Sequence, residues 1–300
     1  MIITYLLEAN IGMGLDHQNS PWEIARAAGA FFLIRDPEVF RKHSEVQSYC
    51  RYIEKQNPDV IFLTEVCGED QKDDICDFLE SKGYHLQFMR AFELHNMNAE
   101  SHRFLYNIIA SKTPIITHNE FQSKVQHKIS EKIYSFSRIK NRLGKTDDAT
   151  YTELKTKKFV GGILDGAGAH CEIDGIHFGL LHAHGTSSSI IENLRDSLPE
   201  GTKGILGGDF NVTQEKGKML AGERFSYIEP NTRTFPYYGQ NDGIISRTIH
   251  RLANNSQAML SHPDQFYKNS SILGATARVL GPREIGLGSD HAVTHVHIGE

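Results

Sequence analysis

The sequence predicts a single α/β domain over residues 1–300. Strand-like and helix-like runs alternate along the chain, and no low-complexity linker or internal repeat separates them. Mixed runs of this kind are typical of sheets that are covered by helices. The apolar fraction of 39% and the charged fraction of 23% belong to an ordinary globular protein, neither disordered nor fibrous.

Two helices of the first half have start signals. The segment SPWE at residues 20–23 has the form of a capping box, with Pro21 at the first helical position. Asp36-Pro37-Glu38 predicts the start of a second helix in the same way, and Asn57-Pro58 predicts its end. The other elements expected in this half are a strand over 2–9, a buried strand PDVIFLTEV ending at Glu65, a helix over 69–82, and strands over 84–90 and 103–112.

The second half continues the alternation. IHFGLLHAH, at residues 176–184, is an apolar strand, and GILGGDFNV, at residues 204–212, is another. NDGIIS, at residues 241–246, is a shorter strand, and the chain closes with GSDHAVTHVHI, whose last part alternates. The helix between the first two strands is expected from its apolar stripe of Ile190, Ile191, Leu194 and Leu198.

Composition and charge exclude several classes of protein. No apolar run approaches the roughly 18 residues that a membrane-spanning helix needs. Glu8 interrupts the first apolar run, which has no basic segment before it, so a signal peptide is not expected. The net charge of −5 disfavours indiscriminate nucleic-acid binding. A cytoplasmic location with reduced thiols is the simplest interpretation of the four scattered cysteines, Cys50, Cys67, Cys76 and Cys171.

One strand end has an unusual pair of polar residues. Asp209 and Asn211 would project from the same side if the strand GILGGDFNV continued through them, because strand side chains alternate between faces. Such a pair suits a site that holds a proton, a water or a metal-bound phosphate. The alternative is a simple turn, since Asp and Asn side chains at a strand end often bind nearby backbone groups.

Other polar residues also fall at the ends of predicted strands, where α/β sheets bind ligands. Each alone has a structural explanation as a turn residue, a surface carboxylate or a satisfied histidine. Their number favours a shared functional site. The full set is Asn10, Glu65, His182, Asp209, Asn211, Asp242, Asp290 and His291.

The stretches around these residues, taken in order, resemble the endonuclease/exonuclease/phosphatase superfamily. This superfamily includes deoxyribonuclease I, abasic-site endonucleases, tyrosyl-DNA phosphodiesterases, neutral sphingomyelinases and inositol-polyphosphate phosphatases. The resemblance implies a four-layer α/β/β/α sandwich of two packed mixed sheets flanked by helices, and divalent-metal-dependent hydrolysis of phosphoester bonds. The matching stretches are EANIG, PDVIFLTEV, LLHAHG, GGDFNV, NDGIIS and GSDHAV.

The resemblance also implies a metal site. Asn10, Glu65 and Asp290 would hold Mg²⁺, or alternatively Mn²⁺. The residue types agree, because Mg²⁺ prefers hard oxygen ligands and keeps room for waters and a substrate phosphate when few protein groups bind it.

Catalytic roles follow from the same resemblance. Asp209 would position and deprotonate the attacking water, and Asn211 would donate to that water or to a phosphate oxygen. His182 and His291 would contact the scissile phosphate from opposite sides. Asp242 would orient His291 by accepting its other ring proton.

Departures from the family narrow this interpretation. Abasic-site endonucleases have a tyrosine-containing motif where this chain has LLHAHG, so abasic-site repair is not expected. The strand FLYNIIASK lacks the acid that orients the equivalent of His182 in deoxyribonucleases, which leaves the partner of His182 unidentified. His184 is either a third imidazole of the site or a surface residue. The helical insertion expected at 13–36 is either a helix packed on the outer face or a lid or partner surface beside the site.

A basic segment bears on the substrate. Residues 124–158 contain ten lysines and arginines against four acidic residues, a net charge of +6, with Tyr134, Phe136 and Tyr151 interleaved. This segment is part of a loop or hairpin expected over 122–158. It is either a solvated surface or a binding site for a polyanion, which would be a nucleic acid or an anionic membrane surface. Aromatic rings beside basic groups favour nucleic acid. A nuclease or DNA/RNA phosphodiesterase is therefore expected, with a phospholipid or inositol-phosphate hydrolase, or a non-catalytic binding module, as alternatives.

Overall fold

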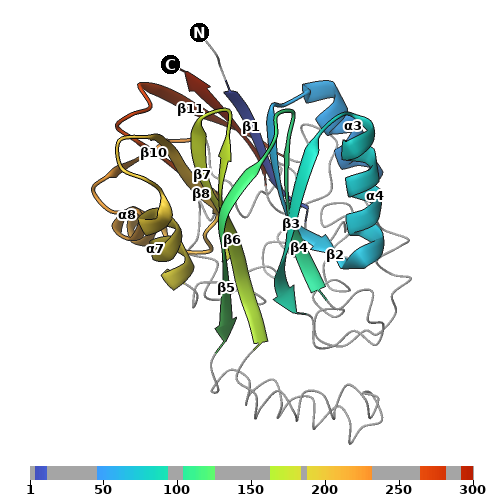
Figure 1. The fold of residues 1–300 in the computed structure, drawn as a ribbon, viewed down its shortest axis with the longest axis horizontal. Coiled ribbons are helices and arrows are strands. Elements are labelled where there is room, and N and C mark those ends of the chain that lie inside the picture. Colours follow the sequence, from blue (N-terminus) through green and yellow to red (C-terminus); the bar gives the residue numbers. More distant parts are fainter. Residues whose placement is uncertain are drawn as a thin grey trace, which may run out of the picture.

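The computed structural model describes seven segments: residues 4–11, 46–93, 104–125, 163–183, 188–231, 264–281 and 292–299. Within them, two six-stranded mixed β-sheets pack face to face and helices cover both outer faces (Figure 1). This α/β/β/α arrangement confirms the expected fold. No helix in these segments has the length and apolar character needed to cross a bilayer.

The two sheets have different strand orders. The first sheet, A, contains β11 (Gly274–Leu280), β12 (Val293–Gly299), β1 (Thr4–Asn10), β2 (Val60–Cys67), β4 (Phe104–Ser111) and β3 (His85–Glu93), in that order. The second sheet, B, contains β5 (Ile116–Val125), β6 (Ile163–Ile173), β7 (Ile176–Ala183), β8 (Lys203–Asp209), β10 (Asp264–Asn269) and β9 (Phe225–Tyr227). Among these pairings, β1–β2 and β7–β8 are the two parallel ones.

Four helices are described, two on each side of the sandwich. On the outer face of sheet A lie α3 (Val46–Gln56) and α4 (Gly68–Ser81). On the outer face of sheet B lie α7 (Ser188–Ser197) and α8 (Gln214–Ala221) (Figure 1). Each helix buries an apolar stripe, as in α3, where Val46, Cys50 and Ile53 face the sheet.

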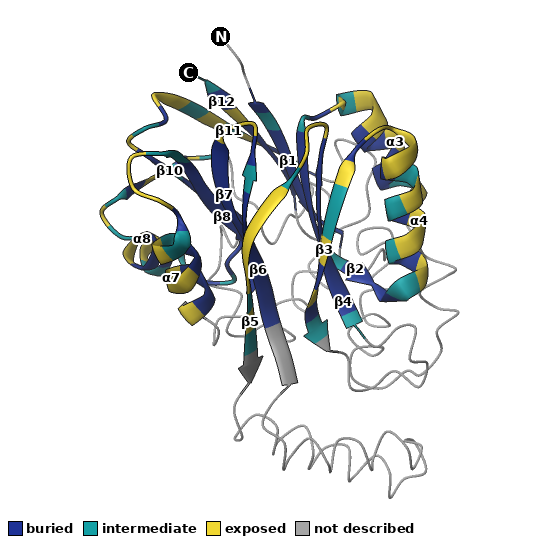
Figure 2. Ribbon diagram, in the orientation of Figure 1, coloured by how far each residue is buried: buried dark blue, intermediate teal, exposed yellow. Residues whose placement is uncertain are grey.

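The central core lies between the two sheets, and Figure 2 shows the strands that form it as largely buried. Strand β7 illustrates the alternation: Phe178 and Leu180 point into this layer, whereas Leu181 packs in the outer layer with α7. Sheet B is thus covered on both sides. That explains why β7 is apolar at nearly every position rather than at every second one.

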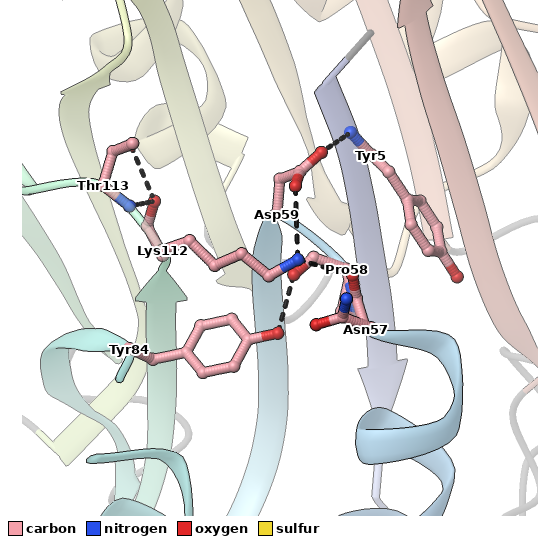
Figure 3. Close-up of polar contacts among 8 residues, drawn as sticks. Tyr5, Asn57, Pro58, Asp59, Tyr84, Lys112 and Thr113 are labelled. Carbon is pink, nitrogen blue, oxygen red and sulfur yellow. Dashed lines mark hydrogen bonds and ion pairs between the residues drawn. The ribbon is translucent and has the colours of Figure 1, made fainter. Parts of the chain in front are cut away.

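Asp59 fixes the amino end of β2 against its neighbours (Figure 3). Its carboxylate accepts a hydrogen bond from the Tyr5 backbone N–H at 2.9 Å and lies 3.4 Å from Lys112 Nζ. The Lys112 ammonium also donates to the Asn57 carbonyl at 2.7 Å, and Tyr84 Oη donates to the Pro58 carbonyl at 2.7 Å. These bonds hold the turn at Asn57-Pro58 and set the register of the strands that lead to the opposite end of the sheet.

The sequence-based boundaries need corrections. Strand β2 does not end at Glu65 but continues to Cys67 through a β-bulge, and β8 stops at Asp209 instead of running to Val212. Residues 122–125 of the predicted basic loop or hairpin are the last residues of β5, which pairs antiparallel with β6, and the rest of that segment lies outside the described residues. The pattern missed α8 and the strands β5, β6, β9, β10 and β11. Strand β6, ILDGAGAHCEI, shows why: its small residues have weak strand preference and are held by pairing on both sides.

Candidate active site

At the carboxyl ends of the central strands, polar side chains replace apolar ones on the faces where the sheets meet. Along β7, the inward-facing Phe178 and Leu180 are followed by His182. On sheet B, His182 pairs in register with Asp209, the last residue of β8; on sheet A, Asn10 ends β1. In each parallel pair the carboxyl ends of the two strands lie at the same end of the sheet. At that end, polar side chains take the place of the apolar core between the sheets.

Direct contacts join the two sheets in this group. Asn10 Nδ2 donates a hydrogen bond to Asp209 Oδ2 at 3.1 Å. His182 Nε2 lies 3.7 Å from the same carboxylate oxygen and 3.8 Å from Glu65 Oε1. Asn10 and Glu65 belong to sheet A, whereas His182 and Asp209 belong to sheet B, so the site spans the interface between the sheets.

Exposure differs sharply within the group. Asn10 and His182 are each 1% exposed and Asp209 is fully buried, whereas the Glu65 side chain is 22% exposed. A buried carboxylate is costly unless hydrogen bonds replace its water, which is the role of Asn10 beside Asp209. The arrangement is a buried polar group that reaches solvent at Glu65.

Asp209 and Asn211 do form the turn that was the alternative interpretation. The Asn211 backbone N–H donates to Asp209 Oδ1 at 3.1 Å, and Asn211 has a positive φ of 48°. The strand does not continue through Asn211, so strand alternation does not place the two side chains together. The turn nevertheless serves the site, because it holds one Asp209 oxygen while the other faces Asn10.

Residues beneath this turn hold it in place. Phe210 is buried, and its ring stacks on Tyr267 with centroids 5.7 Å apart. Gln265 Nε2 donates to the Val212 carbonyl at 2.8 Å, and Tyr267 Oη donates to Gln265 Oε1 at 2.6 Å. The segment GGDFNV is therefore anchored on both sides of Asn211, which limits the motion of Asp209.

Two glycines before Asp209 allow the close packing of β8. A Cβ at Gly207 would lie 2.1 Å from Phe266 Cδ1, and one at Gly208 would lie 2.1 Å from the Leu181 carbonyl oxygen. Gly208 also has a φ of 122°, which side chains rarely adopt. These contacts explain why glycines precede the buried carboxylate.

Glu65 occupies a strained position. The pairing of β2 with β4 shifts register between Leu63 and Val66, and Glu65 lies within this bulge with a φ of 57°. A left-handed conformation at a residue other than glycine costs on the order of 1–3 kcal/mol, and bulges often redirect a side chain beside a functional site. The bulge directs the Glu65 carboxylate of sheet A to within 3.8 Å of His182 Nε2, which belongs to sheet B.

The described part of the site can hold a metal ion. Glu65, His182 and Asp209 each offer one ligand atom, and these atoms all lie within 4.8 Å of one another. The predicted metal ligands were Asn10, Glu65 and Asp290. The first two lie in this group, and the carboxylate of Glu65 supplies the type of oxygen that Mg²⁺ prefers. Asp290 lies outside the described residues, as do Asp242, His291 and His184.

Two buried residues beside the site were missed by sequence reasoning. Asp264, which is 2% exposed, opens β10 and pairs in register with Asp209. Asn107 is buried on β4, and its Nδ2 donates at 3.1 Å to the carbonyl of Ala167, the residue that pairs with His182. The signal for Asp264 was a carboxylate before the aromatic residues of DQFYKN. Asn107 lies in FLYNIIASK, the strand that lacks an acid to orient His182.

Comparisons with known proteins agree with the fold. The model of the Endonuclease/Exonuclease/phosphatase family matches residues 39–291. An endonuclease/exonuclease/phosphatase from Beutenbergia cavernae is similar in structure, with a TM-score of 0.57, 12% identity, and coverage of 99% of this chain and 72% of that chain. A family protein from Leptotrichia buccalis has a TM-score of 0.54, 12% identity, and coverage of 99% and 100%.

A third similar structure is D. rerio TDP2 complexed with a single-strand DNA product. It has a TM-score of 0.51 and 11% identity, and the match covers 100% of both chains. No curated protein matches the sequence. At these identities the likeness is one of fold.

Proposed function

The chain belongs to the endonuclease/exonuclease/phosphatase family, and we propose that it is a divalent-metal-dependent phosphodiesterase that attacks a phosphoester bond with water. The observation that carries the proposal is the polar group at the interface of the sheets. Asn10, His182 and Asp209 are buried there, and the group reaches solvent through the partly exposed side chain of Glu65. Burying a carboxylate, an imidazole and an amide together is costly, and a site that reacts with a charged substrate provides a reason for it.

Asp209 is the proposed general base. Hydrogen bonds from Asn10 Nδ2 and from the Asn211 N–H fix the orientation of its carboxylate. In the proposed reaction Asp209 accepts a proton from water, the water oxygen forms a new bond to phosphorus, and the bond to the leaving oxygen breaks. His182 donates a hydrogen bond from its ring to a phosphate oxygen, which offsets the negative charge that develops there.

His291 is proposed to protonate the leaving oxygen. Sequence reasoning assigned Asp242 to orient it, and Asp264, buried beside Asp209, is a second candidate for that role. Comparing Asp242→Asn with Asp264→Asn separates the two. The orienting residue is the one whose variant changes the pH profile of turnover as His291→Ala does.

Glu65 and Asn10, with Asp290, are proposed to hold Mg²⁺ or Mn²⁺. When bound, such an ion polarises a phosphoryl oxygen and stabilises charge in the transition state. The chain's own contribution is to present a carboxylate at the opening of the site, from a bulge that aims it toward His182.

Replacing Glu65 with Gln is expected to weaken metal dependence more than maximal turnover, because a neutral amide is a poorer Mg²⁺ ligand than a carboxylate. The concentration of Mg²⁺ that gives half-maximal activity should rise by about 10-fold or more, in line with losses seen when metal-site residues are changed. The exposed Glu120→Gln variant is the control. A Mg²⁺ titration identical to that of the unmodified protein would show that Glu65 serves only the bulge.

Nucleic acid is the proposed substrate. The net charge of +6 over residues 124–158, with three interleaved aromatic residues, supports it. A structure of similar fold, D. rerio TDP2, is complexed with a single-strand DNA product. Phospholipid (sphingomyelinase-like) or inositol-phosphate hydrolysis at a membrane surface is the second candidate, because the same basic segment suits anionic lipids.

A substrate panel tests this choice. The purified protein is incubated with Mg²⁺ and single-stranded DNA, double-stranded DNA, RNA, sphingomyelin or phosphoinositides, and each reaction is repeated with EDTA. EDTA-sensitive cleavage of a nucleic acid is expected. Lipid turnover without cleavage of any nucleic acid would replace the first proposal by the second. Failure to hydrolyse even bis(p-nitrophenyl) phosphate would favour a non-catalytic binding module.

Reversing the charge of Lys140, Arg142 and Lys145 to Glu is expected to weaken nucleic-acid binding and to flatten its salt dependence, because fewer counterions are released when fewer phosphates are neutralised. Fluorescence anisotropy over a range of salt concentrations measures both effects. The control reverses Arg51, Lys55 and Lys218, which are exposed on α3 and α8, and so makes the same change in net charge. Equal salt slopes in the two triple variants would remove the basic segment from the interface.

A further inference from the structure

Three histidines meet on the outer face of sheet B, away from the candidate active site. His118 lies on β5, His170 on β6 and His177 on β7. Each offers one ring nitrogen, and these atoms all lie within 4.8 Å of one another. We call this group, together with the neighbouring Glu172, the histidine cluster.

The strand registers explain why these residues meet. His170 and Glu172 are two residues apart on β6 and share a face, and Glu172 pairs in register with His177 on β7. On the other side, the pairing of β5 with β6 shifts register between Thr117 and Asn119, and the extra residue at this irregularity is His118. Three adjacent strands therefore each contribute one imidazole.

The cluster is separate from the active site. His182 is five residues after His177 on the same strand, which is roughly 16 Å at the usual rise of a strand. The two histidines also lie on opposite faces of β7, since residues an odd number apart point to opposite sides. Ala169 and Cys171, which alternate with His170 on β6, belong to the core between the sheets. The cluster therefore lies outside that core.

The distances suit a shared metal ion. His170 Nε2 lies 3.0 Å from His177 Nδ1, and two nitrogens bound to one tetrahedral Zn²⁺ at about 2.0–2.1 Å would be about 3.3 Å apart. The His118 ring centroid is 4.6 Å from that of His170 and 5.6 Å from that of His177. The three rings are thus already gathered, with one nitrogen of each within 4.8 Å of the others.

An unpaired ring nitrogen and a nearby carboxylate at the cluster suit a bound cation. His170 is 2% exposed, and its Nδ1 has no hydrogen-bond partner among the described residues. Glu172 Oε2 is 3.4 Å from His118 Nε2 and 4.0 Å from His177 Nε2, and it supplies negative charge.

We propose that His118, His170 and His177 bind a divalent transition-metal ion of the Zn²⁺ type, with Glu172 orienting the rings, and that the ion links β5, β6 and β7. Imidazole nitrogens suit such ions, whereas Mg²⁺ prefers oxygen ligands. The ion would therefore differ in kind from the one at Glu65. A carboxylate beside ligating histidines also fixes ring orientation and strengthens metal binding. The proposal does not depend on the proposed function.

The test uses the full chain in a His182→Gln background, which removes the imidazole of the active site. After treatment with a chelator, the protein is titrated with Co²⁺ in the presence of excess Mg²⁺, and the visible absorption of Co²⁺ is recorded. One equivalent of Co²⁺ should bind with the absorption of a site of low coordination number, and Zn²⁺ should displace it. Zn²⁺ should also raise the thermal unfolding midpoint.

Variants identify the ligands. His118→Ala, at the partly exposed ring, should lower the Co²⁺ affinity at least 10-fold and abolish the thermal shift; Glu172→Gln should lower the affinity about 10-fold or more. His297→Ala, at an exposed histidine of sheet A, should change neither result. His170→Gln repeats the test at the buried ring, with circular dichroism as the check on folding. The absence of saturable Co²⁺ binding, or equal binding with and without His118, would overturn the proposal.

Discussion

Asp209→Asn is expected to reduce turnover by about 10²–10⁴-fold and leave the fold intact, because one positioned acid–base group typically contributes that much. Asn has nearly the same shape as Asp. Its amide oxygen can therefore still accept the hydrogen bond that the Asn211 N–H donates to Asp209. It cannot accept a proton from water. The loss should therefore appear in kcat, with little change in the thermal unfolding midpoint.

The hydrogen bond between Asn10 and Asp209 allows a second test with a double variant. Asn10 Nδ2 donates to Asp209 Oδ2, and if the Asn10 amide turns by 180° its Oδ1 can accept from the NH₂ of an amide at position 209, so that the contact is kept. The double variant Asp209→Asn/Asn10→Asp has a carboxylate at position 10 on β1 and an amide at position 209 on β8. Because the carboxylate is not at the position of the proposed base, the double variant should remain inactive. Asp174→Asn, at an exposed turn, is the control for the same chemical change elsewhere. More than half of the original activity in Asp209→Asn would refute the assignment of the base.

His182→Gln is expected to lower kcat/KM by a comparable factor of about 10²–10⁴, because the lost ring would bind the phosphate as its charge develops. His182 Nε2 lies between Glu65 Oε1 at 3.8 Å and Asp209 Oδ2 at 3.7 Å, and its ring is buried. Unlike Glu65→Gln, the change should leave the half-maximal Mg²⁺ concentration almost unaltered, if the metal is held by oxygen ligands. Steady-state kinetics at several Mg²⁺ concentrations separates the two effects.

His297→Gln is the matched control for His182→Gln, since it makes the same substitution at an exposed position of sheet A. A large shift in Mg²⁺ dependence for His182→Gln would make His182 a metal ligand, consistent with its place in the group with Glu65 and Asp209. Activity equal to that of the control would leave His182 a structural residue.

Much of the fold could be predicted from local patterns in the sequence. Strands β2 and β7 are continuous apolar runs and α7 has an apolar stripe, so their type follows from periodicity alone. The strand ends were predicted less well. The extension of β2 past Glu65 depends on a bulge in its pairing with β4, and the end of β8 at Asp209 depends on a turn anchored by Gln265. Both are effects of neighbours distant in sequence.

Of the candidate site, the sequence identified Asn10, Glu65, His182 and Asp209, and the structure brings these four together. Their catalytic and metal-binding roles stay predictions, as do those of Asn211, Asp242, Asp290 and His291. Motifs located the four because each follows an apolar run, which is a local feature. Asp264 escaped because its place beside Asp209 arises from the pairing of β10 with β8.

The sequence by itself determined the α/β class, the family and the polar character of the strand ends, because periodicity and short motifs are written in neighbouring residues. Only the tertiary structure decided which polar groups touch. Asn10 and Asp209 are 199 residues apart and come from different sheets, and the histidine cluster draws on three strands and a register shift. Contacts of this kind depend on strand order, register and sheet packing, which no local pattern specifies.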